Sequence, residues 1–160
     1  MMFLNYPNNP TSAVADKSFF KEIIKFARKN NIIICHDAAY SEIYYDNKKP
    51  ISLLEISGAK DVVIEFHSLS KTFNMTGWRI AFAVGNQNIT KGLSKIKSNI
   101  DSGVFHAIQK AGVIALNLSD KITNNLRKIY EERRNIFANG LQNIGWEIKK
   151  PLASFYFWIK

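Results

Sequence analysis

The amino-acid sequence predicts an α/β fold, and two observations support this assignment. Short, largely apolar runs at residues 32–35, 62–66 and 80–84 are typical of parallel strands that are buried on both faces of a sheet. Between and around these runs, apolar residues recur at the spacing of helices. Because strands that alternate with helices form layered α/β domains, we expect helices packed on a central sheet.

The first elements follow from local patterns. Residues 1–4 are typical of the end of a strand, which leads us to expect sequence before them. A turn-rich segment follows at residues 5–12. From residue 16 to residue 30, apolar side chains recur on one helical face, and Asp16 is suited to cap this helix at its N-terminus.

The second half of the chain is more helical. Apolar spacing predicts helices at residues 89–99, 104–118 and about 120–141, and the last of these is long enough to bridge two domains. Two short strands are expected after it, at residues 146–149 and 155–159.

Composition and charge exclude few classes of function. A chain of 160 residues with 46% hydrophobic content can bury one sizeable core. Its formal net charge of +9 would by itself suggest a nucleic-acid or membrane-surface partner. The lysines are instead spread along the chain, and several recur opposite apolar helical positions, which is typical of a solvated face. We therefore rank a basic nucleic-acid-binding protein last and expect no nucleic-acid partner.

The cysteine and hydropathy patterns indicate a cytoplasmic protein without a membrane partner. The single cysteine, Cys35, lies in an apolar run and cannot form an internal disulfide, which fits a reducing compartment. No apolar stretch reaches the roughly 18 residues that cross a bilayer, and the N-terminus lacks the pattern of a signal peptide. The histidines at positions 36, 67 and 106 lack the spacing of metal ligands, so we expect no metal site.

Polar side chains gather directly after the predicted strands, where ligands bind in open α/β sheets. The candidate site residues lie there, or just before the first helix and the third strand: Asn9, Asp37, Tyr40, Ser68, Ser70, Lys71 and Arg79. Taken singly, such residues more often form turns, core aromatics or solvated surface. Taken together, their carboxylate, phenol, amide, hydroxyl, amine and guanidinium groups suit a phosphorylated, cationic aromatic ligand.

Three segments resemble the signature segments of class I/II, fold-type-I aminotransferases. They are NYPNNPT at residues 5–11, HDAAYSE at residues 36–42 and SLSKTFNMTGWR at residues 68–79. Their order and spacing are similar to those of the family as well. The resemblance implies the central part of the family's large α/β/α domain, which binds pyridoxal 5′-phosphate (PLP), with the start of the smaller C-terminal domain.

The resemblance also implies domain boundaries. Residues 1–118 would form part of the large PLP-binding domain, and residues 119–145 a connecting helix. Residues 146–160 would begin the small C-terminal domain.

The resemblance assigns a role to each candidate around the cofactor ring. Lys71 would carry PLP as a Schiff base, and Tyr40 and Asn9 would hydrogen-bond its phenolic oxygen. Asp37 would pair with the pyridinium nitrogen. A carboxylate beside that nitrogen keeps it protonated, so that the ring can accept the electrons of the substrate Cα–H bond.

The remaining candidates would hold the phosphate of the cofactor. By the resemblance these are Ser68, Ser70 and Arg79. The planar guanidinium of Arg79 offers two charge-assisted hydrogen bonds at once, which a lysine would not reproduce.

The implied reaction is a ping-pong transamination between an amino acid and a 2-oxo acid. Once the substrate amine displaces Lys71 from the cofactor, the freed lysine would act as the base. The amino-acid sequence is most similar to LL-diaminopimelate aminotransferases of lysine biosynthesis at residues 5–11, 35–45, 65–86 and 101–105. Aspartate and broad-specificity aminotransferases are close competitors, and family members are homodimers.

Family members are much longer than this chain, and their additional parts supply further cofactor contacts and a carboxylate-binding arginine. Two other hypotheses therefore stay open: a PLP-dependent C–S lyase or decarboxylase, and an inactive truncated remnant. Ser12 stands where the family usually has glycine, and Ala153–Ser154 where a glycine followed by a small residue is common. We expect local strain at Ser12 if that position requires a positive φ.

Overall fold

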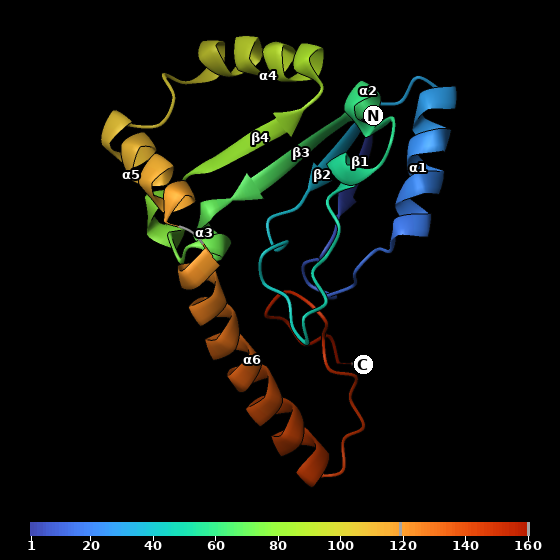
Figure 1. Ribbon diagram of the computed structural model, residues 1–160, viewed down its shortest axis with the longest axis vertical. Helices are drawn as coiled ribbons and strands as arrows, with labels where there is room; N and C mark the ends of the chain where they lie inside the picture. The colour runs from blue at the N-terminus through green and yellow to red at the C-terminus, as the bar shows by residue number, and fades with distance from the viewer. Residues whose placement is uncertain (119, 160) are drawn as a thin grey trace.

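A four-stranded sheet forms the centre of the computed structural model, which describes residues 1–118 and 120–159. Its order is β1-β2-β3-β4 (Figure 1). The strands are β1 (Met2–Asn5), β2 (Ile34–Asp37), β3 (Val63–Ser68) and β4 (Ala81–Gly85). The first three run parallel and helices flank the sheet, so the α/β prediction is confirmed.

The third predicted strand runs in the direction opposite to the expectation. β4 pairs antiparallel with β3, and Ser68 lies opposite Ala81. A parallel crossover usually contains a substantial helix. The chain between these two strands instead forms only α3 (Leu69–Thr72) and η2 (Thr76–Trp78), which turn it back beside β3. None of the residues of β4 is buried, so the expectation of a strand covered on both faces is wrong here.

One face of the sheet carries the main core. It packs against α1 (Lys17–Lys29), η1 (Leu53–Glu55) and α2 (Ala59–Val62), as Figure 1 shows for α1 and α2. The buried residues of this cluster are Phe20, Ile24, Ala27, Ile34, Leu53, Ile56, Ala59 and Val63. α1 begins where predicted, because the Asp16 carboxylate accepts a 2.8 Å hydrogen bond from the Phe19 N–H.

The opposite face of the sheet is open at β1 and β2 within the described residues. Along β2, Ile34 and His36 are buried, whereas Cys35 is half-buried and Asp37 is exposed. Phe3 on β1 is 74% exposed. The prediction that β2 is buried on both faces is therefore wrong for this chain, and β2 begins two residues later than its apolar run.

Three long helices follow β4, close to the predicted positions. They are α4 (Gln87–Ile100), α5 (His106–Asn117) and α6 (Asp120–Asn143). α5 packs closely on the segment before β4, because a Cβ at Gly112 would lie 2.8 Å from Ile80 Cδ1. Figure 1 shows α6 leading away from the sheet. No helix in the described part of the chain is both long and apolar enough to cross a membrane.

The two strands predicted after α6 do not form. Residues 146–159 return as an irregular segment toward the loops below the sheet (Figure 1). Their one backbone pairing of the β type is an isolated bridge between Ala153 and Tyr44. A strand is stable only when a neighbour pairs with its N–H and C=O groups along its length, whereas residues 43–45 pair with this segment only at residues 152–154. The predicted connecting helix begins at residue 119 and the predicted small-domain segment ends at residue 160. Both of these residues lie outside the described part of the chain.

A buried arginine holds α6 to the rest of the molecule. Arg134 donates to both carboxylate oxygens of Asp46, at 2.8 and 2.9 Å, and to the Pro151 carbonyl at 3.1 Å. These hydrogen bonds lower the pKa of Asp46. Arg134 therefore joins the helix, the loop after β2 and the C-terminal segment at one point.

Candidate functional site

The sequence-predicted site residues meet at one edge of the sheet. β1, β2 and β3 run parallel, and Asn5 lies opposite Asp37, so the carboxyl ends of the strands share this edge. β4 runs the other way, which places its first residue, Ala81, opposite Ser68. Arg79, two residues before Ala81, therefore lies at the same edge. The antiparallel direction of β4 is what brings Arg79 to the site.

Asn9 and Lys71 both lie close to Tyr40. The Asn9 side-chain amide donates a 3.2 Å hydrogen bond to the Tyr40 hydroxyl. The Lys71 Nζ lies 5.9 Å from the centre of the Tyr40 ring, within the range of a cation–π interaction. Burial and a hydrogen bond with Tyr156 raise the pKa of the Tyr40 hydroxyl, which therefore keeps its proton at neutral pH. It can act as a donor to an anionic oxygen.

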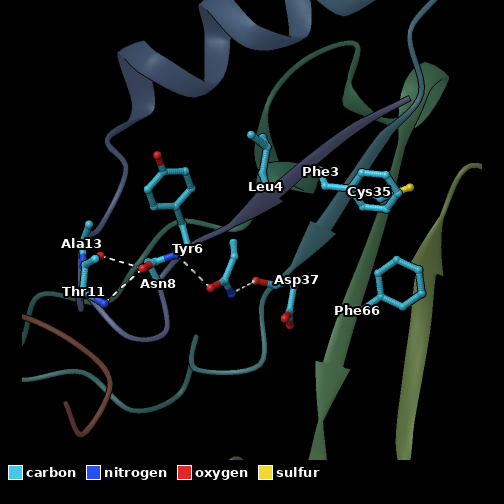
Figure 2. A pocket seen from close by; sticks show the side chains of 10 residues that line it. Phe3, Leu4, Tyr6, Asn8, Thr11, Ala13, Cys35, Asp37 and Phe66 are labelled. Carbon is cyan, nitrogen blue, oxygen red and sulfur yellow. Dashed lines mark hydrogen bonds between the residues drawn. The ribbon is translucent and has the colours of Figure 1, made fainter.

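Asp37 ends β2 with a carboxylate that carries no cation partner among the described residues. Its Oδ1 accepts only a 3.3 Å hydrogen bond from the Ala39 N–H. Its backbone carbonyl is held separately by the Asn5 side chain, at 2.9 Å. Figure 2 shows Asp37 at the rim of a pocket of about 660 Å³ that Phe3 and Phe66 also line. The carboxylate is thus fixed at its base and available to a protonated nitrogen.

Ser68, Ser70 and Arg79 offer donors that suit an anion. Neither serine hydroxyl makes a hydrogen bond to any described residue, and Ser70 is buried. Arg79 is exposed and donates from Nη1 to the Thr76 carbonyl at 3.0 Å. Its backbone adopts the left-handed conformation, with φ of 51°, a costly state that is frequent at functional sites. The other guanidinium N–H groups remain available.

Comparison with known proteins decides the family of this chain. The family model described as "Aminotransferase class I and II" matches residues 1–160.

The chain belongs to the class I and II aminotransferase family.

Similar proteins agree with this family membership. The LL-diaminopimelate aminotransferase of Nitratidesulfovibrio vulgaris is 53% identical, over 100% of this chain and 41% of that protein. The enzyme of the same name from Maridesulfovibrio salexigens is 55% identical, over 100% and 42%. The chain therefore spans about two fifths of the length of the curated relatives it matches. The resemblance stated from the three signature segments is confirmed.

Solved structures share the fold. BacF from Bacillus subtilis superposes with a TM-score of 0.91 at 43% identity, over 96% of this chain and 39% of its own. The aspartate aminotransferase of Thermotoga maritima gives a TM-score of 0.85 at 25% identity, over 97% and 40%. The chain thus has the architecture of part of a fold-type-I aminotransferase.

The donor set of the site fits PLP, the cofactor of this family. A phosphorylated pyridine needs an anion cradle, a carboxylate for the ring nitrogen, donors for the phenolic oxygen and an amine. The anion cradle would come from Arg79 with Ser68 and Ser70, and the carboxylate from Asp37. The donors would come from Tyr40 and Asn9, and the amine from Lys71. The chemistry of the residues present therefore agrees with the cofactor.

Sequence reasoning missed Tyr156. Its hydroxyl lies 2.9 Å from the Tyr40 hydroxyl, although 116 residues separate the two. The rings also meet edge to face, with centroids 5.6 Å apart. No local pattern marks Tyr156, because its partner becomes its neighbour only when the C-terminal segment folds back.

Sequence reasoning also missed a buried network centred on Glu65. Its carboxylate accepts hydrogen bonds from His67 Nε2 at 2.9 Å and from Ser52 Oγ at 3.0 Å, and lies 3.4 Å from His36 Nδ1. Burial would raise the pKa of Glu65, but the two imidazoles outweigh it and lower the pKa to about 2. A single charged residue within the otherwise apolar run at residues 62–66 was the available signal. The histidines precede Asp37 and Ser68, so the network supports the site edge.

Proposed function

We propose that this chain forms the cofactor-binding part of a PLP-dependent aminotransferase that transfers the amino group of LL-diaminopimelate to 2-oxoglutarate in lysine biosynthesis. The observation that carries the proposal is the joint geometry of Lys71, Tyr40 and Asn9 in a chain 53% identical to enzymes of that name. The identity of the relatives supports this substrate over the aspartate or broad-specificity alternative.

Lys71 is the residue that holds the cofactor in this proposal. PLP, when bound, supplies a sink for the electrons of the substrate Cα–H bond. The Nζ of Lys71, released when a substrate amine takes its place, accepts the Cα proton and returns it. The position of Nζ over the Tyr40 ring keeps the amine beside the site rather than in solvent.

The other candidates bind and orient. Asp37 holds a proton on the ring nitrogen, which its open carboxylate supports. Tyr40 and Asn9 donate to the phenolic oxygen.

The phosphate contacts complete the proposed site. Ser68, Ser70 and Arg79 bind the phosphate with hydroxyl and guanidinium donors that have few protein partners. Arg79 adds the positive charge that the two serines lack.

The remaining expectations belong to the same proposal. Residues 1–118 form part of the large domain, residues 119–145 connect it, and residues 146–160 begin the small domain. α6 covers most of the connecting segment, which supports this division. The partners are small amino acids and 2-oxo acids and a second copy of the full-length chain, in the cytoplasm, where the unpaired Cys35 suits a reducing environment.

The test is an absorption spectrum of the purified chain with PLP, followed by borohydride reduction and peptide mapping. We expect a visible band in the wild-type chain, and an adduct on Lys71 alone. Lys71→Ala should abolish both, while Lys60→Ala, which changes an exposed lysine on α2, should keep both. Adducts scattered over surface lysines, or no band, would reject the proposed site.

A further inference from the structure

The Tyr40 hydroxyl has two hydrogen-bond neighbours in the protein. The Asn9 amide donates to it at 3.2 Å, and the Tyr156 hydroxyl lies 2.9 Å away. A phenol has one proton and two acceptor positions. If Tyr40 is to donate its proton to a ligand oxygen, both neighbours must act as donors to Tyr40. Tyr156 therefore has to supply its own proton to Tyr40 in the ligand-bound state.

The backbone of Tyr156 is held by a closed ring of three hydrogen bonds. Its N–H donates to Ser154 Oγ at 3.3 Å, and its carbonyl accepts from Ser12 Oγ at 2.7 Å. The two serine oxygens lie 2.6 Å apart. Because the Ser12 hydroxyl donates its only proton to the Tyr156 carbonyl, the Ser154 hydroxyl must be the donor in the hydrogen bond between the two serines. Each of the three donors then has one acceptor, and the ring is complete.

The ring joins the same two segments that meet at Tyr40. Ser12 lies in the loop that carries Asn9, and its N–H donates to the Asn8 carbonyl at 2.9 Å. Ser154 is fixed from the other side, since its N–H donates to the Ile43 carbonyl at 2.8 Å. Asn9 and Tyr156 thus approach Tyr40 from two segments that the serines hold together.

Both serines occupy an unfavourable backbone conformation. Ser12 has φ of 58° and Ser154 has φ of 63°, in the left-handed region. Both serines are buried, and both hydroxyls take part in hydrogen bonds. At Ser12 the strain expected from the sequence is present, and the hydroxyl makes contacts that a glycine cannot make.

We propose that Tyr156 is a positioning residue of the cofactor site, which the Ser12–Ser154 ring holds so that its hydroxyl and Asn9 direct the Tyr40 proton toward the cofactor. The inference rests on the proposed function and adds a residue to it. Tyr156 acts through Tyr40. Among the described residues, the other ionisable groups around Tyr40 are Lys71 and Asp37.

The test is an absorption titration of the PLP-loaded chain against pH. A hydrogen bond donated to the phenolic oxygen of PLP stabilises its deprotonated form, so weakening that bond raises the pH midpoint of the absorption change. We expect Tyr156→Phe to raise the midpoint by about half to one pH unit, in the same direction as Tyr40→Phe but less. An unchanged or lowered midpoint in Tyr156→Phe would overturn the inference.

The matched control is Tyr130→Phe. Tyr130 stacks on Phe155 in the same aromatic cluster, with centroids 5.4 Å apart, and its hydroxyl makes no hydrogen bond to a described residue. Its loss should leave the midpoint unchanged. A shift as large as that of Tyr156→Phe would show that any change in the cluster moves the midpoint, and would also overturn the inference.

Ser12→Gly tests the ring with little risk to folding. Glycine adopts the φ of 58° without strain, so this variant opens the ring and removes a backbone cost at the same position. We expect the midpoint to rise as in Tyr156→Phe. A wild-type midpoint in Ser12→Gly would reject the role of the ring.

A measurement without cofactor separates this inference from the proposed function. Absence of a PLP band in the wild-type chain would reject the proposed function alone. The ¹³Cζ resonance of Tyr40 in the cofactor-free protein should shift in Tyr156→Phe and stay in Tyr130→Phe. An unshifted Tyr40 resonance in Tyr156→Phe would overturn the coupling of the two tyrosines whether or not PLP binds.

Discussion

The side-chain amide of Asn9 donates a 3.2 Å hydrogen bond to the hydroxyl of Tyr40, and so joins the loop after β1 to the loop after β2. Asn5 holds the Asn9 backbone in place, because its Oδ1 accepts from the Asn9 N–H at 2.8 Å. Asn5 itself ends β1, opposite Asp37. The contact therefore depends on the parallel pairing of β1 and β2.

Replacing Asn9 should weaken cofactor binding. We expect Asn9→Ala to lower the affinity for PLP by about fivefold to tenfold, since it removes one proposed donor to the phenolic oxygen and one support of Tyr40. An absorption titration with PLP measures the effect. Asn117→Ala, which removes an amide bonded within α5 to the Val113 carbonyl, is the control and should bind like the wild type. Equal affinities for the two variants would contradict the prediction.

Asp37→Asn should change the protonation of the bound cofactor more than its affinity. The amide keeps the shape of the side chain but removes the negative charge that stabilises a protonated ring nitrogen. With ¹⁵N-labelled PLP, the ring nitrogen should resonate in the protonated range in the wild-type chain at neutral pH and in the unprotonated range in the variant. A protonated nitrogen in both would show that another group performs this task.

The Glu65 network should make stability depend on acid. The pKa of Glu65 in the folded chain is about 2, below its ordinary value of 4.5. Its contribution is therefore fully present above pH 4.5 and is lost as the pH falls toward 2. The free energy of unfolding, measured with urea across this window, should fall more steeply for the wild type than for Glu65→Gln.

The same variant should be less stable at neutral pH. We expect Glu65→Gln to lose about 1–3 kcal/mol at pH 7, because a buried carboxylate with several donors is replaced by an amide that cannot accept from all of them. Glu22→Gln, on the exposed face of α1, provides the control and should retain both the stability and the pH slope of the wild type. Matching slopes for Glu65→Gln and the wild type would reject the network as the cause.

Gly85→Ala should disrupt the end of β4. Gly85 has φ of 147°, and a Cβ there would collide with the Val63 carbonyl oxygen and the Ile64 Cα, which are backbone atoms that cannot turn aside. We expect a loss of about 1–3 kcal/mol or more in the free energy of unfolding. Gly92→Ala in α4, where an added Cβ meets no atom within 4 Å, is the control and should stabilise slightly. Similar stabilities for both variants would contradict the close approach of the two strands.

Local structure was predictable from local sequence. The helix that begins after Asp16 follows from apolar spacing and a capping side chain, which act between residues three or four apart. The segments with Lys71, Asp37 and Asn9 identified a family and seven candidate site residues, because a ligand with several functional groups imposes residue types at fixed chain positions. α4, α5 and α6 were likewise found within a few residues of their bounds.

The features that depend on distant segments were decided only by the tertiary structure. The direction of β4, which brings Arg79 to the site edge, follows from a turn that the hydropathy of residues 80–84 does not encode. The two strands expected after α6 fail for the same reason, since pairing needs a neighbour that the pattern itself does not specify. The Tyr40–Tyr156 contact joins residues 116 apart. By itself, then, the sequence determined the short-range elements and the kind of chemistry the chain carries. Strand direction, pairing and the contacts of Tyr156 and Glu65 were decided by the folded chain, because their energies arise only between segments that folding brings together.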